Sequence, residues 1–543
     1  IDGESGSLFG QGVLEIAEPD QVRPQDDVIP SLLVLTRKGC GRFKARIVAC
    51  GNFQNVTASE SYSSVVARES WMMVMQTALR QGWEVASIDI STAFLQTDES
   101  EDDPSRPVTY LRPPKGTALD GYLQSNMPST LWKVLKSIYG LRTAGHSWQQ
   151  TLGKWLKSEG YVQCIYDDCI WIHRKTDVTV LTYVDDLVVL GPRKEIDAFF
   201  DRVSKSRGGR FECTEPTYLV DATPEEPFVF VGHALYLSHE KGMKRLHISQ
   251  EEYVVELALK HGFDPTKDFP VTTLRPEEFD LDILFQGQKL TPAELTKLRG
   301  YVGSVAYASG SRLDSIAANA ALAGGQAAGT TKHLESAKRL IRFLMGTAQR
   351  HLVIDLPPIA KGKSGEWVLH MDAYADANYS KSHARAGYLL KLDRSTFGWR
   401  SQLLKQICLS TCEAELMGAT GAARAALAAK NVLCEWLEHK SPKVKIVVHC
   451  DNLSSVLIAQ GRAGLRKVRH LCLADLFVRS LRDEGLIDVA WVSGKVNPAD
   501  ILTKVLGGAA MDRSLALFPL IGENGWPATT AAKVQARLDS AKA

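Results

Sequence analysis

The alternation of apolar and polar positions predicts two kinds of structure in the first half of the chain. Apolar and β-branched runs within residues 83–95, 161–173 and 178–190 predict strands. Apolar residues at helical spacing predict helices over 69–81 and 141–159. Residues 98–128 form an acidic, proline-containing insertion, and the first 31 residues are polar and rich in Gly, Asp and Pro. The pattern therefore predicts an α+β unit preceded by a linker or extended arm.

The second half changes character twice. A strand-rich piece at 226–250 and a helix at 249–261 lead into residues 291–350, where Ala, Leu and Gly recur at helical spacing. From Glu366 onward the order becomes strand, strand, strand, long helix, strand, helix, helix, strand, helix. That order predicts a helical middle segment followed by an α/β domain with a mixed sheet.

Composition narrows the classes of protein only a little. With 543 residues and 23% charged side chains, the chain is long enough for several domains. The formal net charge is only +2, so a nucleic-acid partner must be inferred from local Lys and Arg clusters. The ten cysteines form no C-x-x-C pair, which predicts reduced intracellular thiols that fill the core. No apolar run approaches the length of a membrane span, and the start "IDGESGSLFG" is typical of a piece of a longer chain.

The stretch "VTVLTYVDDLVVLG" places two adjacent carboxylates, Asp185 and Asp186, between two apolar runs. Two like charges about 4 Å apart repel by about 1 kcal/mol in water and by more in a half-buried site. Either a solvated turn or a bound cation must compensate them. A third carboxylate, Asp89, interrupts the apolar strand "VASIDIS", so one strand and a neighbouring hairpin together offer oxygen ligands for Mg²⁺.

At this point the residues resemble a known family. The segments "FKARIVACGNF", "ESYSSVV", "GWEVASIDISTAFL", "LWKVLKSIYGL", "GYVQCIYDDCIWI" and "TYVDDLVVLG" resemble, in order, the reverse transcriptase of copia-type LTR retrotransposons. The resemblance implies that Asp89, Asp185 and Asp186 are the metal-binding catalytic carboxylates. It also implies that the pair at Asp167 and Asp168 is structural, with Asp168 in a strand.

The resemblance further implies four substrate-binding residues. Phe94 matches the aromatic steric gate that favours dNTPs, and Gly140 lies in the segment under the nucleotide and template. Lys44 and Arg46 match the fingers hairpin that holds the incoming triphosphate, and Arg46 is the stronger candidate because guanidinium contacts phosphate through two nitrogens. For all four residues, plain packing is the alternative.

A second set of carboxylates resembles the ribonuclease H of the same retrotransposons. The set occurs in "AYADANYS", "STCEAELMGA", "VVHCDNLSSV" and "NPADILTK", and its members are Asp376, Glu415, Asp451 and Asp500. Element ends of a mixed sheet could bring them around two metal ions. Asp372 competes with Asp376, and the sequence context favours Asp376. The chain departs from the family at Asn378 and Cys472, which leaves a role for His470 in substrate contact open.

The resemblance implies a right-hand polymerase of α+β class with fingers, a palm with an antiparallel sheet, and a thumb. A helical connection domain and an α/β RNase H-like domain with a mixed sheet follow it. The expected boundaries are 1–31 linker or arm, 32–232 fingers and palm, 233–276 thumb, 277–362 connection, 363–508 ribonuclease H and 509–543 tail.

The implied cofactor is Mg²⁺, two ions per active site, with Mn²⁺ as a substitute. The implied partners are an RNA template, a DNA primer and product, an RNA–DNA hybrid, dNTPs and other parts of the same polyprotein, with no membrane. The expected location is cytoplasmic, including virus-like particles, with access to the nucleus.

Two main functions remain open from the sequence, and a third possibility is that only the ribonuclease is active. The first is an RNA-directed DNA polymerase with ribonuclease H activity. The second is a decayed or domesticated retroelement protein that binds nucleic acid without catalysis. All seven carboxylates are intact, which favours the enzyme.

Overall fold

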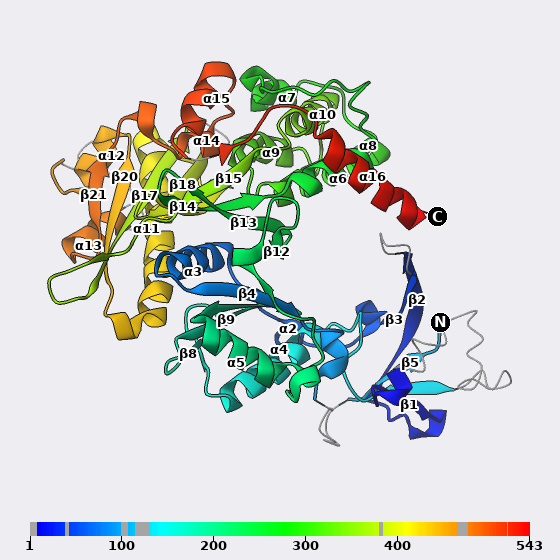
Figure 1. The fold of residues 1–543 in the computed structure, drawn as a ribbon. Coiled ribbons are helices and arrows are strands. Elements are labelled where there is room, and N and C mark those ends of the chain that lie inside the picture. Colours follow the sequence, from blue (N-terminus) through cyan, green and yellow to red (C-terminus); the bar gives the residue numbers. More distant parts are fainter. Residues whose placement is uncertain are drawn as a thin grey trace. The chain divides into compact units, whose positions relative to one another are not determined.

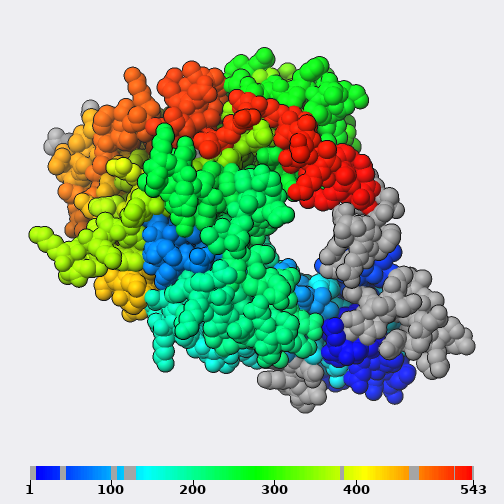
Figure 2. All heavy atoms as spheres, in the orientation of Figure 1, coloured from blue at the N-terminus to red at the C-terminus, as the bar shows by residue number. Residues whose placement is uncertain are grey.

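The computed structural model describes residues 8–37, 43–98, 107–114, 130–379, 384–463, 476–518 and 520–542, which are the coloured atoms in Figure 2. The chain folds into two compact units. The first unit comprises residues 1–66, 84–217 and 536–543, and the second comprises 67–83 and 218–535. Among the described residues, no helix is long and apolar enough to cross a membrane.

The first unit contains two sheets. One has the order β1-β6-β5-β2-β3, formed by Leu14–Ala17, Leu131–Val134, Thr109–Arg112, Asp27–Arg37 and Phe43–Ala49. The other has the order β11-β4-β10-β9-β8-β7, formed by Thr217–Tyr218, Glu84–Asp89, Asp186–Gly191, Val178–Tyr183, Ile170–His173 and Val162–Gln163. The helices of the first unit are α2 (Ala58–Ser61), α4 (Ala144–Ser158) and α5 (Arg193–Val203) (Figure 1).

The core of the second sheet in this unit follows from its sequence. In β9 every residue but the last is buried, and in β10 every residue but the first, which is what "VTVLTY" and "DLVVLG" predict for strands covered on both faces. The polar residues fall at the strand ends that meet at the hairpin tip. The apolar runs therefore hold the sheet, and the tip is left to the aspartates.

The second unit contains one antiparallel and one mixed sheet. The antiparallel sheet has the order β12-β13-β14-β15-β22, formed by Phe228–Phe230, His233–Glu240, Met243–Ser249, His351–Asp355 and Leu520–Ile521. The mixed sheet has the order β19-β18-β17-β20-β21, formed by Ser395–Leu403, Arg385–Leu392, Trp367–Asn378, Lys443–Cys450 and Asp488–Trp491, with β16 (Ala360–Lys361) beside β17. β20 runs parallel to both β17 and β21, so the predicted mixed sheet is confirmed.

The remaining helices belong to the second unit, except that the end of α16, from residue 536 on, is grouped with the first. They are α3 (Arg68–Arg80), α6 (Glu251–Lys260), α7 (Leu281–Leu284), α8 (Pro292–Ala308), α9 (Ile316–Ala323), α10 (Thr331–Gly346), α11 (Thr411–Trp436), α12 (Leu453–Ala459), α13 (Phe477–Asp483), α14 (Asp500–Thr503), α15 (Gly508–Leu515) and α16 (Ala528–Lys542). α11 packs along β17, β18 and β20 (Figure 1). α8 begins where Thr291 and Glu294 form a capping box around Pro292, so local sequence sets that boundary.

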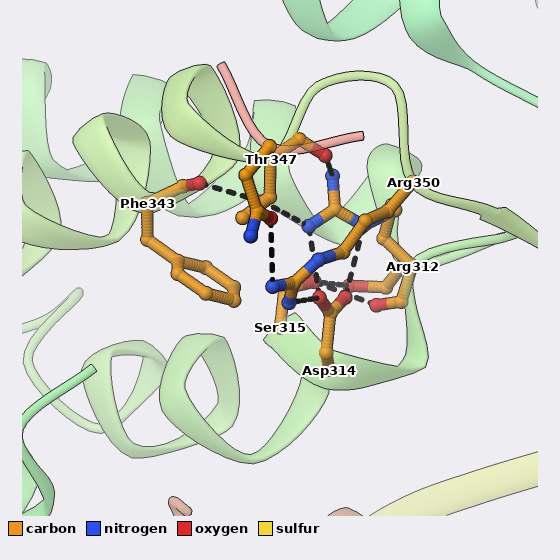
Figure 3. Close-up of polar contacts among 8 residues, drawn as sticks. Arg312, Asp314, Ser315, Phe343, Thr347 and Arg350 are labelled. Carbon is orange, nitrogen blue, oxygen red and sulfur yellow. Dashed lines mark hydrogen bonds and ion pairs between the residues drawn. The ribbon is translucent and has the colours of Figure 1, made fainter. Parts of the chain in front are cut away.

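A buried ionic network ties the helical segment together (Figure 3). Two nitrogens of Arg312 donate to the two carboxylate oxygens of Asp314 at 2.9 Å, and Arg350 lies 3.4 Å from the same carboxylate. Arg312 also donates to the carbonyl oxygen of Thr347. Because a buried carboxylate is tolerated only when it is paired, these contacts explain why "SGSRLDSIA" keeps both charges inside the protein.

Three expectations about the organisation of the chain are wrong. Within the predicted arm 1–31, β1 and the start of β2 are strands, and Val13 and Leu14 are buried. A four-residue strand is too short for its alternation to stand out among Asp, Gln and Pro. The second concerns the predicted helical connection and the predicted tail, because β15, near the end of the connection, is a strand and pairs with β22 in the tail.

The third wrong expectation concerns Asp168, which lies in the turn between β7 and β8 rather than in a strand. Its carboxylate accepts a hydrogen bond from the Ser64 hydroxyl at 3.0 Å. The neighbouring Asp167 carboxylate caps the backbone N–H of Cys169 at 3.1 Å. These contacts give both residues a structural role, because turns use aspartate oxygens to satisfy local donors.

Two carboxylate clusters as candidate active sites

The first carboxylate cluster, Asp89, Asp185 and Asp186, gathers at a hairpin tip. β9 ends at Tyr183 and β10 begins at Asp186, so Val184 and Asp185 form a two-residue turn. Asp186 lies directly opposite Asp89 in the antiparallel pairing of β10 with β4. The carbonyl oxygen of Asp185 accepts the N–H of Ile90 at 2.9 Å. Since opposed residues have Cβ atoms only about 5 Å apart, strand register places Asp186 beside Asp89, and Asp185 precedes Asp186 in the turn.

The turn that carries Asp185 is strained. Val184 has φ 56°, a left-handed conformation that a β-branched residue rarely adopts. Its carbonyl oxygen accepts the indole N–H of Trp148 at 2.6 Å, and Trp148 is buried in α4. Strain of this kind persists where the surroundings hold it, and it is common at functional sites.

The electrostatics of the first cluster favour a bound cation. Asp89 and Asp185 are exposed, whereas Asp186 is half-buried. Burial, followed by the charges of Asp185 and Asp89, raises the pKa of Asp186 to about 6. A divalent ion would relieve that repulsion, and a donor set made only of carboxylate oxygens fits Mg²⁺.

Two of the candidate nucleotide-binding residues, Arg46 and Phe94, contact the same aromatic ring, that of Tyr139. The guanidinium of Arg46 lies 4.9 Å from the ring centroid of Tyr139, and Tyr139 meets Phe94 edge to face at 5.8 Å. Gly140 has φ 89°, and an added Cβ would lie 2.1 Å from the carbonyl oxygen of Ala49. Packing therefore already requires glycine there. The Lys44 side chain, together with His470 and Cys472, lies outside the described residues.

The second carboxylate cluster, Asp376, Glu415, Asp451 and Asp500, is assembled from four element ends. Asp376 lies near the end of β17, Glu415 in the first turns of α11, Asp451 directly after β20, and Asp500 begins α14. Glu415, Cys450 and Asp451 offer ligand atoms within 4.8 Å of one another, which is the one such group among the described residues. The parallel pairing of β17 with β20 places both strand ends at one edge of the sheet.

Burial dominates the electrostatics of the second cluster. Asp376 is 1% exposed and Glu415 is 7% exposed. Burial, followed by the charges of Asp376 and Asp451, raises the pKa of Glu415 to about 8. Burial likewise raises the pKa of Asp376 and of Asp451. Burial therefore disfavours the ionised form of these carboxylates unless a positive charge lies beside them.

An internal ammonium group compensates part of that charge. Lys504 Nζ lies 3.5 Å from Asp376 Oδ1 and also pairs with Asp500. Burial alone would lower the pKa of Lys504, but Asp376, Asp500 and Asp451 together raise it. The Thr503 hydroxyl donates to the second oxygen of Asp376. The carboxylates around Lys504 therefore stabilise a positive charge at this position.

The alternative residue Asp372 lies away from the second cluster. Its carboxylate contacts His449 Nε2 at 2.8 Å, and His449 stacks on Tyr374 at 4.6 Å. The structure therefore brings Asp376, and not Asp372, beside the other three carboxylates.

Sequence reasoning misses three neighbours of the second cluster: Cys450, Thr503 and Lys504. The Cys450 thiol donates to Glu415 at 3.6 Å, whereas the cysteine pattern predicts core filler. The position of Cys450 next to Asp451, and the "TK" of "ADILTK", are the signals in the sequence that point to these neighbours.

Comparison with known protein families indicates the class of protein to which the first part of the chain is similar. The family described as reverse transcriptase (RNA-dependent DNA polymerase) matches residues 16–207, which comprise most of the first unit together with α3 of the second. Over most of its length the chain is a relative of the Pol polyproteins of copia-type retrotransposons, as the sequence motifs predict. It is 27% identical over 86% of its length to the Pol polyprotein from transposon RE1 of Arabidopsis thaliana.

Two further transposon polyproteins are similar to most of the chain. The chain is 26% identical to the Pol polyprotein from transposon TNT 1-94 of Nicotiana tabacum over 86% of its length, and 24% identical to the Ty1-BL Gag-Pol polyprotein of Saccharomyces cerevisiae over 88%. It spans 30%, 33% and 26% of these three relatives in turn.

Solved ribonuclease H structures align with 27% of the chain. The N-terminal RNase H domain of Mycobacterium tuberculosis rv2228c is 19% identical, with 96% of that chain covered and a TM-score of 0.19. LC11-RNase H1 in complex with an RNA/DNA hybrid is 16% identical, with 99% of that chain covered and a TM-score of 0.19.

Proposed function

We propose that the chain is an RNA-directed DNA polymerase with ribonuclease H activity. The polymerase would extend a DNA primer with dNTPs on an RNA or DNA template at the first carboxylate cluster. The ribonuclease would cleave the RNA strand of the resulting hybrid at the second. The observation that carries the proposal is the register that sets Asp186 opposite Asp89 inside the reverse transcriptase domain.

The residues proposed to hold Mg²⁺ are the carboxylates of each cluster, with two ions at each. When bound, such ions activate the attacking oxygen and stabilise the leaving oxygen of an in-line displacement. Asp89 and Asp185 are exposed and therefore accessible to ions and substrate, while Asp186 is more buried. Mn²⁺ would bind the same oxygen ligands.

We further propose a right-hand layout for the polymerase. The sheet that carries Arg46 would be the fingers, and the sheet that carries Asp89 and Asp186 would be the palm. The segment 233–276 would be the thumb, 277–362 the connection and 363–508 the ribonuclease domain. Arg46, Lys44 and Gly140 would contact the triphosphate and template, and Phe94 would exclude a ribose 2′-hydroxyl. The contact of Arg46 and Phe94 with the same Tyr139 ring supports a shared pocket.

The nucleic acid would be bound mainly through its phosphates. With a net charge of only +2, binding must rely on local basic residues, so affinity should fall steeply with salt and depend little on base sequence.

Primer extension with Mg²⁺ tests the polymerase. The wild-type chain should extend a DNA primer on an RNA template, and the Asp185→Asn, Asp186→Asn double variant should not. Robust synthesis by the double variant would contradict the assignment. The matched control is Asp167→Asn, Asp168→Asn, which changes the other adjacent pair and should retain extension.

A labelled RNA–DNA hybrid tests the ribonuclease in parallel. Mg²⁺-dependent cleavage that disappears in Asp451→Asn supports the second cluster. Tight hybrid binding with neither extension nor cleavage would favour the decayed or domesticated element instead.

A further inference from the structure

Two histidines from neighbouring strands meet outside both carboxylate clusters. His247 lies on β14 and His351 on β15 in the antiparallel sheet of the second unit. Nδ1 of His247 is 3.0 Å from Nε2 of His351, and the Tyr236 hydroxyl is 3.4 Å from the same Nε2. The His247 nitrogen and the Tyr236 hydroxyl therefore both lie within 3.4 Å of His351 Nε2, and the Tyr236 ring stacks on the His247 ring at 4.3 Å.

Hydrogen bonds around the pair determine which ring nitrogens carry lone pairs. Nδ1 of His351 is 2.9 Å from the carbonyl oxygen of Gln349. A carbonyl only accepts, so in the neutral ring Nδ1 carries the proton and Nε2 directs its lone pair toward His247. Metal-binding histidines commonly make this bond from their second nitrogen, because it fixes the tautomer.

His247 also has a hydrogen-bond partner for its other ring nitrogen. Nε2 of His247 is 2.7 Å from the Ser238 hydroxyl, which can accept its proton. In that tautomer Nδ1 of His247 also presents a lone pair, and two lone pairs face each other across 3.0 Å. A divalent ion beside the line that joins the two nitrogens, at about 2.1 Å from each, would remove the conflict. The other tautomer, in which Ser238 donates, is a plain hydrogen bond between two neutral rings.

The surroundings keep both rings in the form that binds metal. Burial, followed by the neighbouring His351 and Arg245, lowers the pKa of His247 to about 4. Burial also lowers the pKa of His351. Burial thus favours the neutral form of both rings, which is the form that binds a metal ion. The charge of Arg245 is balanced by Asp355 at 2.8 Å and by Glu240.

We propose that His247 and His351, with Tyr236 as a third ligand, bind a zinc-class divalent transition metal ion. Imidazole suits Zn²⁺, Ni²⁺ and Cu²⁺, whereas Mg²⁺ prefers the all-oxygen carboxylate clusters. Because the ligands come from β13, β14 and β15, a bound ion would fasten strands 104 residues apart in sequence.

Cobalt titration of the full-length chain tests the site. Co²⁺ replaces Zn²⁺ and gives a visible absorption band when imidazole and oxygen bind it in a tetrahedral arrangement. Saturating Mg²⁺ would fill the carboxylate clusters, and the Cys450→Ser background would remove a thiolate that could also bind Co²⁺. We expect one equivalent to bind, with affinity at least about tenfold weaker in His351→Ala and about tenfold weaker in Ser238→Ala.

The matched control is His239→Ala, which removes an exposed histidine from the same strand as Tyr236 and should leave the titration unchanged. If His351→Ala does not fold, His351→Gln and Ser238→Ala provide the comparison. No stoichiometric binding by the wild type, or equal affinity in a folded His351 variant, would overturn the proposal and leave a hydrogen-bonded pair of neutral rings.

Discussion

The two carboxylate clusters gather negative charge in opposite surroundings. In the first cluster Asp89 and Asp185 are exposed, strand register sets Asp89 opposite Asp186, and Asp185 lies in the adjoining turn. In the second cluster Asp376 and Glu415 are almost fully buried, and Lys504 supplies a positive charge among them. Water screens like charges in the first case, whereas the second needs protons, an ammonium group or metal ions. The comparison suggests that the second cluster is the more sensitive to cations and pH.

The largest effect should come from removing one carboxylate at each cluster. Asp89→Asn should lower primer extension by about a thousandfold or more and leave hybrid cleavage unchanged, because each cluster stabilises its own transition state. Asp376→Asn should do the reverse. The two assays are run on both variants with the same substrate. Loss of both activities in either single variant would contradict two separate sites.

The pH dependence of stability should distinguish the clusters in the absence of divalent ions. Glu415 has a folded pKa raised from 4.5 to about 8, so the folded state binds its proton more tightly than the unfolded chain does. Its stabilisation is fully present below pH 4.5 and is lost as pH rises through 8. Over that window we expect a loss on the order of 5 kcal/mol in the free energy of unfolding, measured by urea denaturation.

Two variants separate that pH effect. Glu415→Gln cannot ionise and should flatten the decline up to pH 8. Asp186→Asn should remove only the smaller decline that belongs to Asp186, whose folded pKa is raised from 3.8 to about 6. An unchanged profile in Glu415→Gln would mean that Glu415 is ionised normally in solution.

The difference between the clusters also shows what the sequence could predict. The apolar runs around Asp185 and Asp186 specify a hairpin, and alternation along "VASIDIS" specifies the strand beside it, so their meeting is a matter of local pattern. The order of strands and helices after Glu366 likewise predicts the mixed sheet. Site roles for Arg46 and Phe94 remain predictions.

Other features depend on contacts that no local pattern encodes. Lys504 reaches Asp376 across 128 residues of sequence, and its role appears only when α14 packs against β17. α3 lies within the residues 16–207 that match the reverse transcriptase family, yet it is grouped with the second unit, where Arg80 pairs with Asp393. Tertiary packing decides which unit a helix joins, and the helical spacing of apolar residues does not identify the element against which the helix packs.

A medium effect is expected from Lys504→Met. Removing the ammonium group takes away a charge that competes with metal ions for Asp376 and Asp500. The Mg²⁺ concentration for half-maximal hybrid cleavage should fall by about tenfold, with primer extension unaffected. Lys495→Met, at an exposed lysine of the nearby loop, is the control. A higher Mg²⁺ requirement in Lys504→Met would show that Lys504 contributes to the reaction rather than competing with the ions.

The smallest effect should come from the strained turn of the first cluster. Val184→Gly removes the cost of a left-handed β-branched residue, on the order of 1–2 kcal/mol, but it adds backbone entropy to the unfolded chain. We expect a net gain of about 0.5 kcal/mol in the free energy of unfolding, with a several-fold loss of primer extension because Asp185 is held less firmly. Lys241→Gly is the matched control, because Lys241 has φ 50° in a hairpin distant in sequence from either cluster and is not β-branched. It should gain less stability and leave extension intact. A stability loss above about 1 kcal/mol in Val184→Gly would show that valine packing, and not turn geometry, holds the tip in place.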